Sequence, residues 1–340
     1  MDRAGIKSYY SQRSVDEVMG VDARFDERAQ EIYKGLDPKT VFFPPKNYEH
    51  YPEAPEEELH SITDSLNAYG EISWRAFSVR HVGGTAIWLS LVGGDDYVII
   101  NNGKAANKEL QSDDNMYVPL RRSPKTDIAV VGPPTESESS LVIAMGVADC
   151  LAVSVIDERT RAFGFAHAGR TGTALRTSEK AAVLLKGEFA SRRSDLVAYL
   201  GEGVCTACYP LDEKAIDSFI ADFGGKTEVS KVLAQYPQAI QMFEFDGKKS
   251  YTLDHYAFNR YVLAQQVHEI VEAPNCTARS NEHCGSLPDG HVPAEKQQPF
   301  FSHRRVNGKT VGWRMEDGTM LELNTSHLTM PRNLAAMVRK

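Results

Sequence analysis

The sequence predicts an α+β protein in which helices pack on mixed β-sheets. Two observations support this fold class. From Ile72 onward, short runs rich in Val, Ile and Phe are bounded by Gly, Pro or Asp, as buried strands are. Between and after these runs lie longer segments with apolar residues at helical spacing. Strands and helices alternate without an internal repeat, which argues against a solenoid or propeller.

The expected strands are five apolar runs: AFSVRHVGGTAIWLSLV, DDYVII, TDIAVV, SSLVIAMGVADCLAVSVID and RAFGFAHAG. Three segments have the pattern of amphipathic helices. The first spans 173–186 and is followed by Gly187. The second is capped by Asp212 and ends at Gly224 and Gly225, and the third runs from Asp254 to about Glu272. The order of the strands does not follow from these patterns.

Composition limits the class of protein. The chain has 340 residues, of which 42% are hydrophobic, so it is long enough for a packed core. The net charge is −8 and the charges are interspersed, so we expect no nucleic-acid partner. The N-terminal segment has no apolar h-region, and the most apolar stretch, 141–156, is shorter than the ~20 residues that span a bilayer. With five scattered cysteines, these features predict a cytoplasmic protein with reduced thiols and no membrane contact.

The chain divides by composition. Residues 1–68 are polar and rich in Glu, Asp, Tyr and Pro, and 44–58 has the composition of a linker. We expect residues 1–68 to form an N-terminal extension and residues 69–340 to form the catalytic domain.

Two motifs carry candidate chemistry. Asp149 and Cys150 interrupt an apolar run, so they are either buried and satisfied or placed at a strand break that faces a cleft. A buried cysteine that packs as a small apolar residue is the alternative. His167 ends another apolar run, ahead of Gly169 and Arg170 and an expected helix. Such a turn suits an anion, and a guanidinium adds donors for phosphate, although a tight turn with a hydrogen-bonded histidine explains it equally well.

Two further motifs are weaker. His81 lies on a strand before Gly83 and Gly84, where a histidine is more often structural than a ligand. Cys205 and Cys208 form a CxxC motif, but the chain has no second CxxC to complete a four-thiolate site.

Together these motifs resemble a known family. ADCLAV with Cys150, AHAG with His167, YLGEGVCTACY, SYTLDHYAFNR and FFSHRR followed by VGWRM occur in the order of the laccase-domain or polyphenol oxidase family, the YfiH-like proteins. The resemblance covers about residues 72–316. It implies a layered YfiH-like fold and purine nucleoside phosphorolysis, with a zinc site made of a His, a Cys and a second His.

The resemblance assigns two zinc ligands to Cys150 and His167, and it places Gly83 at the position of the family's first histidine. His81, two residues earlier, is the candidate third ligand, because alternate strand positions point to the same face. A site that relies on His81 is expected to bind zinc more weakly. Multicopper oxidase chemistry fits poorly, because the ten histidines are scattered and no His-Cys-His run occurs.

The leading hypothesis is phosphorolysis of adenosine or inosine to the base and ribose 1-phosphate. Catalysis is assigned to Cys150, His167, Arg170 and Asp149, and phosphate binding to Gly169, Arg170, Arg304 and Arg305. The partners are then a small nucleoside and phosphate. One alternative is a hydrolase with Cys150 as nucleophile and His167 as base. Another is a degenerate homologue that serves as a binding protein or scaffold. The sequence leaves the substrate and the oligomeric state open.

Overall fold

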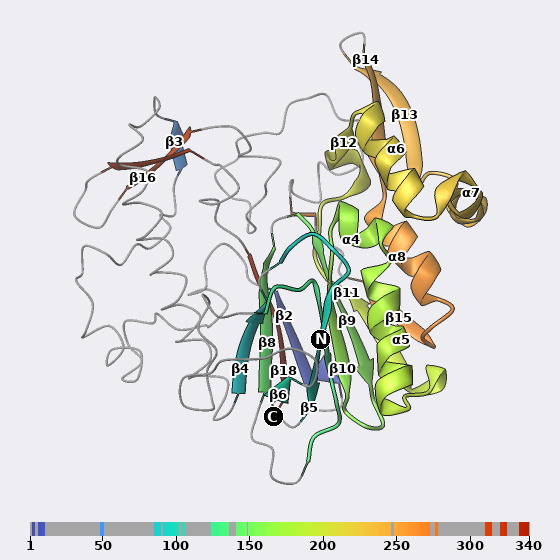
Figure 1. Cartoon of the computed structure of the whole chain (residues 1–340). Helices are drawn as coiled ribbons and strands as arrows, with labels where there is room; N and C mark the ends of the chain where they lie inside the picture. Colours follow the sequence, from blue (N-terminus) through green and yellow to red (C-terminus); the bar gives the residue numbers. More distant parts are fainter. Residues whose placement is uncertain are drawn as a thin grey trace.

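The protein is described from a computed structural model, which covers residues 2–3, 6–10, 48–50, 85–89, 91–101, 104–105, 124–135, 141–147, 149–245, 248–272, 276–277, 310–314, 320–324 and 333–339. These residues form mixed β-sheets with helices packed on one of them, which confirms the predicted α+β class (Figure 1). No helix in these ranges is both long and apolar enough to cross a membrane.

The largest sheet has seven strands in the order β15-β11-β9-β10-β7-β5-β6. Its neighbours are antiparallel except for the β11–β15 and β5–β7 pairs, which are parallel. Its strands are β5 (Tyr97–Asn101), β6 (Lys104–Ala105), β7 (Ile128–Val131), β9 (Leu151–Asp157), β10 (Phe163–Ala168), β11 (Leu196–Leu200) and β15 (Glu269–Glu272).

A second sheet has five strands in the order β1-β2-β18-β8-β4. Only β4 and β8 are parallel; the other neighbours are antiparallel. The strands are β1 (Asp2–Arg3), β2 (Ile6–Tyr10), β4 (Thr85–Leu89), β8 (Leu141–Val147) and β18 (Asn333–Arg339).

The remaining described strands form two three-stranded sheets. One has the order β12-β14-β13, with β12 (Pro210–Leu211), β13 (Ile240–Phe245) and β14 (Lys248–Leu253). The other has the order β17-β16-β3, with β3 (Tyr48–His50), β16 (Thr310–Arg314) and β17 (Met320–Asn324). Strands β2 and β3, both from the expected extension 1–68, therefore pair with strands from the C-terminal part of the chain. The division at residue 68 itself stays a prediction.

The helices differ from the sequence expectation at two points. The described helices are α4 (Arg170–Ala174), α5 (Thr177–Phe189), α6 (Glu213–Asp222), α7 (Gly225–Gln235) and α8 (His255–Leu263), with short 3-10 turns η4 (Arg193–Asp195) and η5 (Thr206–Cys208). The segment predicted as one helix, 173–186, is divided between α4 and α5, because Arg176 adopts a left-handed conformation with φ 55°. Gly187 does not end α5, which continues to Phe189.

The second point is the third predicted helix, which is too long. Helix α8 ends at Leu263, and residues 269–272 form strand β15, which pairs in parallel with β11. The cap predicted at Asp212 is confirmed: its carboxylate accepts a 2.7 Å hydrogen bond from the N–H of Ala215.

Helices α5 and α8 lie on one side of the seven-stranded sheet, and the five-stranded sheet lies on the other (Figure 1). A cluster of buried apolar side chains fills each of the two interfaces. Alternate side chains of β7, such as Ile128 and Val130, pack toward α5 and α8, whereas Ala129 and Val131 face the five-stranded sheet. This alternation follows from the two-residue period of a strand that is buried on both faces. Gly164 brings β10 close to α5, because a Cβ there would lie 3.0 Å from the Cβ of Ala181.

Candidate functional site

The residues predicted to carry chemistry meet where β9 begins and β10 ends. The two strands are antiparallel, and Leu151 at the start of β9 pairs with Ala168 at the end of β10. Cys150 and Gly169, the next residues outward, therefore lie beside each other. A Cβ on Gly169 would stand 2.7 Å from Sγ of Cys150 and 3.2 Å from Nε2 of His167. The absent side chain of Gly169 is what lets the thiol and the imidazole converge.

His167 is held from both sides of its ring. Its Nδ1 lies 2.8 Å from Oδ1 of Asp127, and its side chain also hydrogen-bonds to Cys150. Burial alone would lower the pKa of His167, since it disfavours the charged ring. The interactions with Cys150 and Asp127 outweigh burial and raise this pKa to about 9. The imidazole is therefore protonated at neutral pH.

Asp127 is the functional residue that sequence reasoning missed. It is fully buried ahead of β7, and its carboxylate accepts hydrogen bonds of 3.0–3.2 Å from the N–H groups of residues 92–94. Burial acts to raise the pKa of Asp127, but these bonds and His167 lower it below its usual value. A charged residue at the start of a buried apolar run requires hydrogen-bond or ionic partners. This rule could have drawn attention to Asp127 in the sequence, but it does not identify His167 as the partner.

Asp149 precedes Cys150 and has a left-handed backbone with φ 72°. Its buried carboxylate accepts a 2.7 Å hydrogen bond from the hydroxyl of Thr277, and its carbonyl accepts one of 2.9 Å from the N–H of Val204. These contacts make Asp149 an anchor for the turn that carries Cys150. A catalytic role for Asp149 stays a prediction.

The remaining predicted residues are placed only in part. Arg170 is the first residue of α4 and is half-buried. His81, Gly83, Arg304 and Arg305 lie outside the described residues, so their assigned roles stay predictions.

The Cys150–His167 pair fits two of the three expected zinc ligands. A ligating histidine commonly donates its second N–H to a carboxylate, as Nδ1 of His167 does to Asp127. The described residues around the pair supply a thiol and an imidazole. A third ligand has to come from elsewhere, and His81 is the predicted one.

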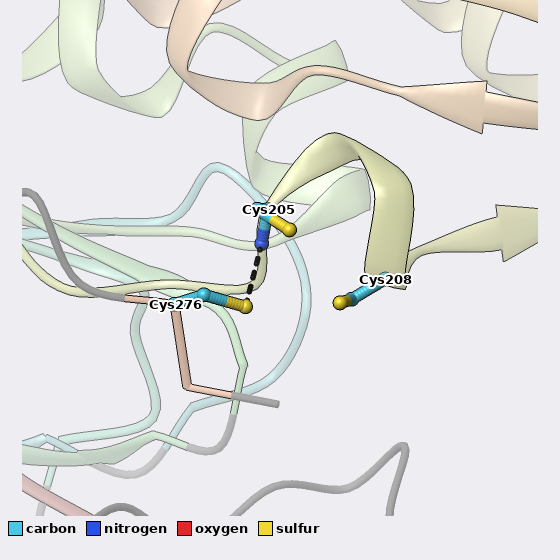
Figure 2. Close-up of side chains that lie close together, drawn as sticks. All are labelled: Cys205, Cys208 and Cys276. Atoms are coloured by element: carbon cyan, nitrogen blue, oxygen red, sulfur yellow. Dashed lines mark hydrogen bonds between the residues drawn. The ribbon is translucent and has the colours of Figure 1, made fainter. Parts of the chain in front are cut away.

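A second set of potential ligands lies at Cys205, Cys208 and Cys276, whose sulfur atoms are all within 4.8 Å of one another (Figure 2). The structure thus adds a third thiol to the CxxC motif, and the cluster has the composition to bind a metal. A hydrogen bond with Cys208 lowers the pKa of Cys205, but contact with Cys276 and burial raise it overall. Hydrogen bonds with the other two thiols, together with burial, raise the pKa of Cys208.

An open depression elsewhere on the surface contains neither the Cys150–His167 pair nor the three cysteines of the cluster. It lies at the C-terminal end of α8 and is lined by residues that include Arg193, Arg260 and Glu272. Nε and Nη2 of Arg260 donate hydrogen bonds to the two carboxylate oxygens of Glu272, at 2.6 and 2.7 Å. We therefore place the candidate site at Cys150, where the thiol, the imidazolium of His167 and the carboxylate of Asp127 lie next to one another in that order.

The chain is similar to known proteins in both sequence and structure. The family described as multi-copper polyphenol oxidoreductase laccase matches residues 85–321. The purine nucleoside phosphorylase YlmD of Bacillus subtilis is 27% identical over 177 residues, which is 51% of this chain and 53% of that protein. A purine nucleoside phosphorylase of Streptomyces coelicolor is 28% identical over 158 residues, 43% of this chain and 62% of that protein. The chain thus spans about half the length of these curated relatives.

Among solved structures, the hypothetical protein YfiH of Bacillus licheniformis is similar over 87% of this chain and 91% of its own, with a TM-score of 0.51 and 19% sequence identity. This likeness supports the YfiH-like fold that the sequence motifs predicted.

Proposed function

The chain belongs to the family described as multi-copper polyphenol oxidoreductase laccase, and we propose that it is a cytoplasmic purine nucleoside phosphorylase-like enzyme that acts at Cys150 and His167. Two matched relatives, from Bacillus subtilis and Streptomyces coelicolor, carry the name purine nucleoside phosphorylase. The observation that carries the proposal is the position of His167, which is bound at Nδ1 by Asp127 and faces Cys150.

The chemistry requires a proton donor. In phosphorolysis an oxygen of phosphate bonds to the anomeric carbon of the ribose while the bond from that carbon to the purine breaks. The electron pair of the broken bond stays on the purine, which leaves as a neutral base once it takes up a proton. His167 carries such a proton at neutral pH, since its pKa is about 9. Hydrogen phosphate loses a proton as the ester forms, and this proton restores the imidazolium.

Asp127 and three arginines have supporting roles in this scheme. Asp127 fixes the orientation of the imidazolium ring, because its own carboxylate is held by three backbone N–H groups. Arg170, Arg304 and Arg305 are proposed to neutralise phosphate, which lowers the repulsion between the nucleophile and its site.

A zinc ion held by Cys150, His167 and His81 would supply Lewis-acid stabilisation of negative charge at the same place. Zinc would also occupy the Nε2 atom of His167 that otherwise transfers a proton. The proton-donor role and the zinc site are therefore alternatives, and activity measured as a function of zinc content separates them.

The direct test is incubation of the protein with adenosine or inosine, with and without phosphate. We expect free base and ribose 1-phosphate in a phosphate-dependent reaction that falls by about a hundredfold or more in Cys150→Ala and His167→Ala. Arg170→Ala is expected to raise the KM for phosphate without a comparable loss of stability. Lys226→Ala, on the first turn of α7, is the matched control that removes a cation away from the site. Absence of turnover on either nucleoside at saturating phosphate would contradict the proposal.

A second candidate is a hydrolase with Cys150 as the nucleophile. It is favoured by one specific observation: Cys150, His167 and Asp127 follow the order nucleophile, base and orienting carboxylate. Phosphate-independent hydrolysis that Cys150→Ala abolishes, together with a covalent intermediate on the Cys150 peptide in mass spectra, distinguishes this function from phosphorolysis.

A further inference from the structure

The three-thiol cluster is assembled from two separate parts of the chain. Cys205 precedes the 3-10 turn η5 and Cys208 ends it, so the turn places both side chains on one side. Cys276 comes from a distant segment that forms an isolated parallel bridge with Gly203. In Figure 2 the three sulfur atoms face a common space between the turn and this segment.

Backbone N–H groups around the cluster donate hydrogen bonds, one to a carbonyl group and one to a sulfur atom. The N–H of Cys205 points at Sγ of Cys276, at 3.4 Å, and the N–H of Cys208 donates to the carbonyl of Cys205, at 3.0 Å. Backbone N–H groups directed at sulfur stabilise the thiolate form of a ligating cysteine. Cys208 and Cys276 are buried, with 3% and 6% of their surface exposed, whereas Cys205 is half-buried.

The distances suit one metal ion. A tetrahedral zinc with Zn–S bonds of about 2.3 Å requires its sulfur ligands to be about 3.8 Å apart. The three sulfur atoms already lie within 4.8 Å of one another, so a shift of about 1 Å or less per side chain completes the geometry. Apolar packing alone explains buried thiols, but it gives no reason for three sulfur atoms from two segments to converge.

We propose that Cys205, Cys208 and Cys276 bind one Zn²⁺ ion through three thiolates, at a site separate from Cys150 and His167. Thiolates are soft ligands, which favour zinc over Mg²⁺ or Ca²⁺. The described residues supply three protein ligands, and we assign the fourth position to water or to a small ligand on the half-buried side, at Cys205. This proposal does not depend on the proposed enzymatic activity.

The site has a structural consequence for Cys150. Thr277, next to the ligand Cys276, donates its N–H to the carbonyl of Gly203 at 3.1 Å and its hydroxyl to the carboxylate of Asp149 at 2.7 Å. From the other segment, Val204, next to Cys205, donates its N–H to the carbonyl of Asp149 at 2.9 Å. The zinc ion therefore links the segment of Val204 and Cys205 to the segment of Cys276 and Thr277. Because both segments hydrogen-bond to Asp149, the ion also fixes the position of the turn before Cys150.

Metal analysis of the full-length protein tests the site. After purification under reducing conditions and dialysis with one equivalent of ZnSO₄ added, we expect retained zinc in the wild type. We expect at least a tenfold weaker affinity in Cys208→Ser and in Cys205→Ser. Cys205→Ser is the more informative variant, because its half-buried position makes a folding defect less severe; circular dichroism confirms that it is folded. Cys150→Ser and His167→Ala are the matched controls that remove the other potential zinc site, and they are expected to retain the metal at the thiol cluster.

Co²⁺ substitution gives a second readout. Each thiolate contributes near-ultraviolet ligand-to-metal absorption, so the wild type is expected to show a band that loses about a third of its intensity in Cys205→Ser and none in Cys150→Ser. Zinc affinity that is unchanged in both cluster variants, or that is lost only in Cys150→Ser, would overturn the assignment. So would a wild-type protein that takes up no zinc, or a Cys205–Cys208 disulfide that persists under reducing conditions.

Discussion

Nδ1 of His167 lies 2.8 Å from a carboxylate oxygen of Asp127. His167 is in β10 and Asp127 directly precedes the neighbouring strand β7, 40 positions earlier in the sequence. The pKa of His167 is raised from 6.5 to about 9 by this contact and by Cys150. A histidine whose pKa is higher in the folded protein contributes stability that is fully present below pH 6.5 and is lost as the pH rises through about 9.

We therefore predict that the free energy of unfolding falls between about pH 6.5 and 9.5, on the order of 3 kcal/mol for this group. In Asp127→Asn the pKa of His167 falls, so the free energy of unfolding decreases less steeply with pH. Urea denaturation at several pH values between about 6 and 10 measures this slope. Asp157→Asn, which removes another buried carboxylate far from the ring, is the control that keeps the wild-type slope. Equal slopes in Asp127→Asn and the wild type would show that the two residues are not coupled.

Gly169 provides the second prediction. Its backbone, at φ −68° and ψ −171°, suits any residue, so Gly169→Ala acts only through the new Cβ, which would stand 2.7 Å from Sγ of Cys150. We expect the thiol to be displaced from His167, with a change of about tenfold or more in the alkylation rate of Cys150 and a stability loss of ~1–3 kcal/mol. Mass spectrometry of the Cys150 peptide follows the alkylation.

Gly187→Ala is the matched control for that experiment. A Cβ on Gly187 meets nothing within 4 Å, and the residue lies inside α5. Alanine is expected to stabilise the helix by ~0.5–1 kcal/mol and to leave the alkylation of Cys150 unchanged. If both glycine variants alkylate at the wild-type rate, the space at Gly169 has no part in placing the thiol.

Thr277 provides the third prediction. Thr277→Val keeps the shape of the side chain but leaves the buried carboxylate of Asp149 without its 2.7 Å hydroxyl donor. We expect a stability loss of ~1–3 kcal/mol, because a buried carboxylate that loses one of its hydrogen-bond donors is less well compensated for its desolvation. Thr277→Ser restores the hydroxyl and is expected to recover most of the loss. Indistinguishable urea midpoints for the Val and Ser variants would rule out this hydrogen bond as the cause.

Asn259 provides the fourth prediction. This fully buried amide on α8 donates to the hydroxyl of Thr173 and accepts from the hydroxyl of Ser178, so it joins α8 to both α4 and α5. Asn259→Leu leaves both hydroxyl groups without this partner, and we expect a stability loss of about 3 kcal/mol or more. Ser218→Ala, which removes an exposed hydrogen bond on α6, is the control and is expected to stay within ~0.5 kcal/mol of the wild type. Thermal unfolding of the two variants measures the difference.

The meeting of Cys150 and His167 was predictable because Cys150 interrupts one apolar run and His167 ends another, and adjacent strands bring such positions together. Asp127 was not, since its contact depends on β7 being the other neighbour of β10, and strand order does not follow from apolar patterns. Cys276 was missed for a similar reason. The composition of the polar segment around Cys276 gives no sign that its partner is a CxxC motif 71 residues earlier.

The error in the third helix has a specific physical cause. Val267, Ile270 and Val271 fit a helical face, but they are β-branched, and β-branched residues also favour strands. Pairing of Ala198 with Ile270 in the seven-stranded sheet decides between the two conformations, and no local pattern contains that information. The break at Arg176 likewise depends on distant residues: its guanidinium donates to the carbonyl of Phe223 and contacts Glu228.

Strand β18 lies between β2 and β8, so the five-stranded sheet joins residues 6–10 to residues 335–339. During synthesis on the ribosome, this sheet has no central strand until residues 333–339 have emerged, whereas every described strand of the seven-stranded sheet is complete once residue 272 has been added. Contacts between such distant positions are slow to form, because a long loop must close first. The apolar face of the seven-stranded sheet that carries Phe163 and Phe165 is thus the last to be covered, and it is the surface that a nascent chain exposes to chaperones or to aggregation.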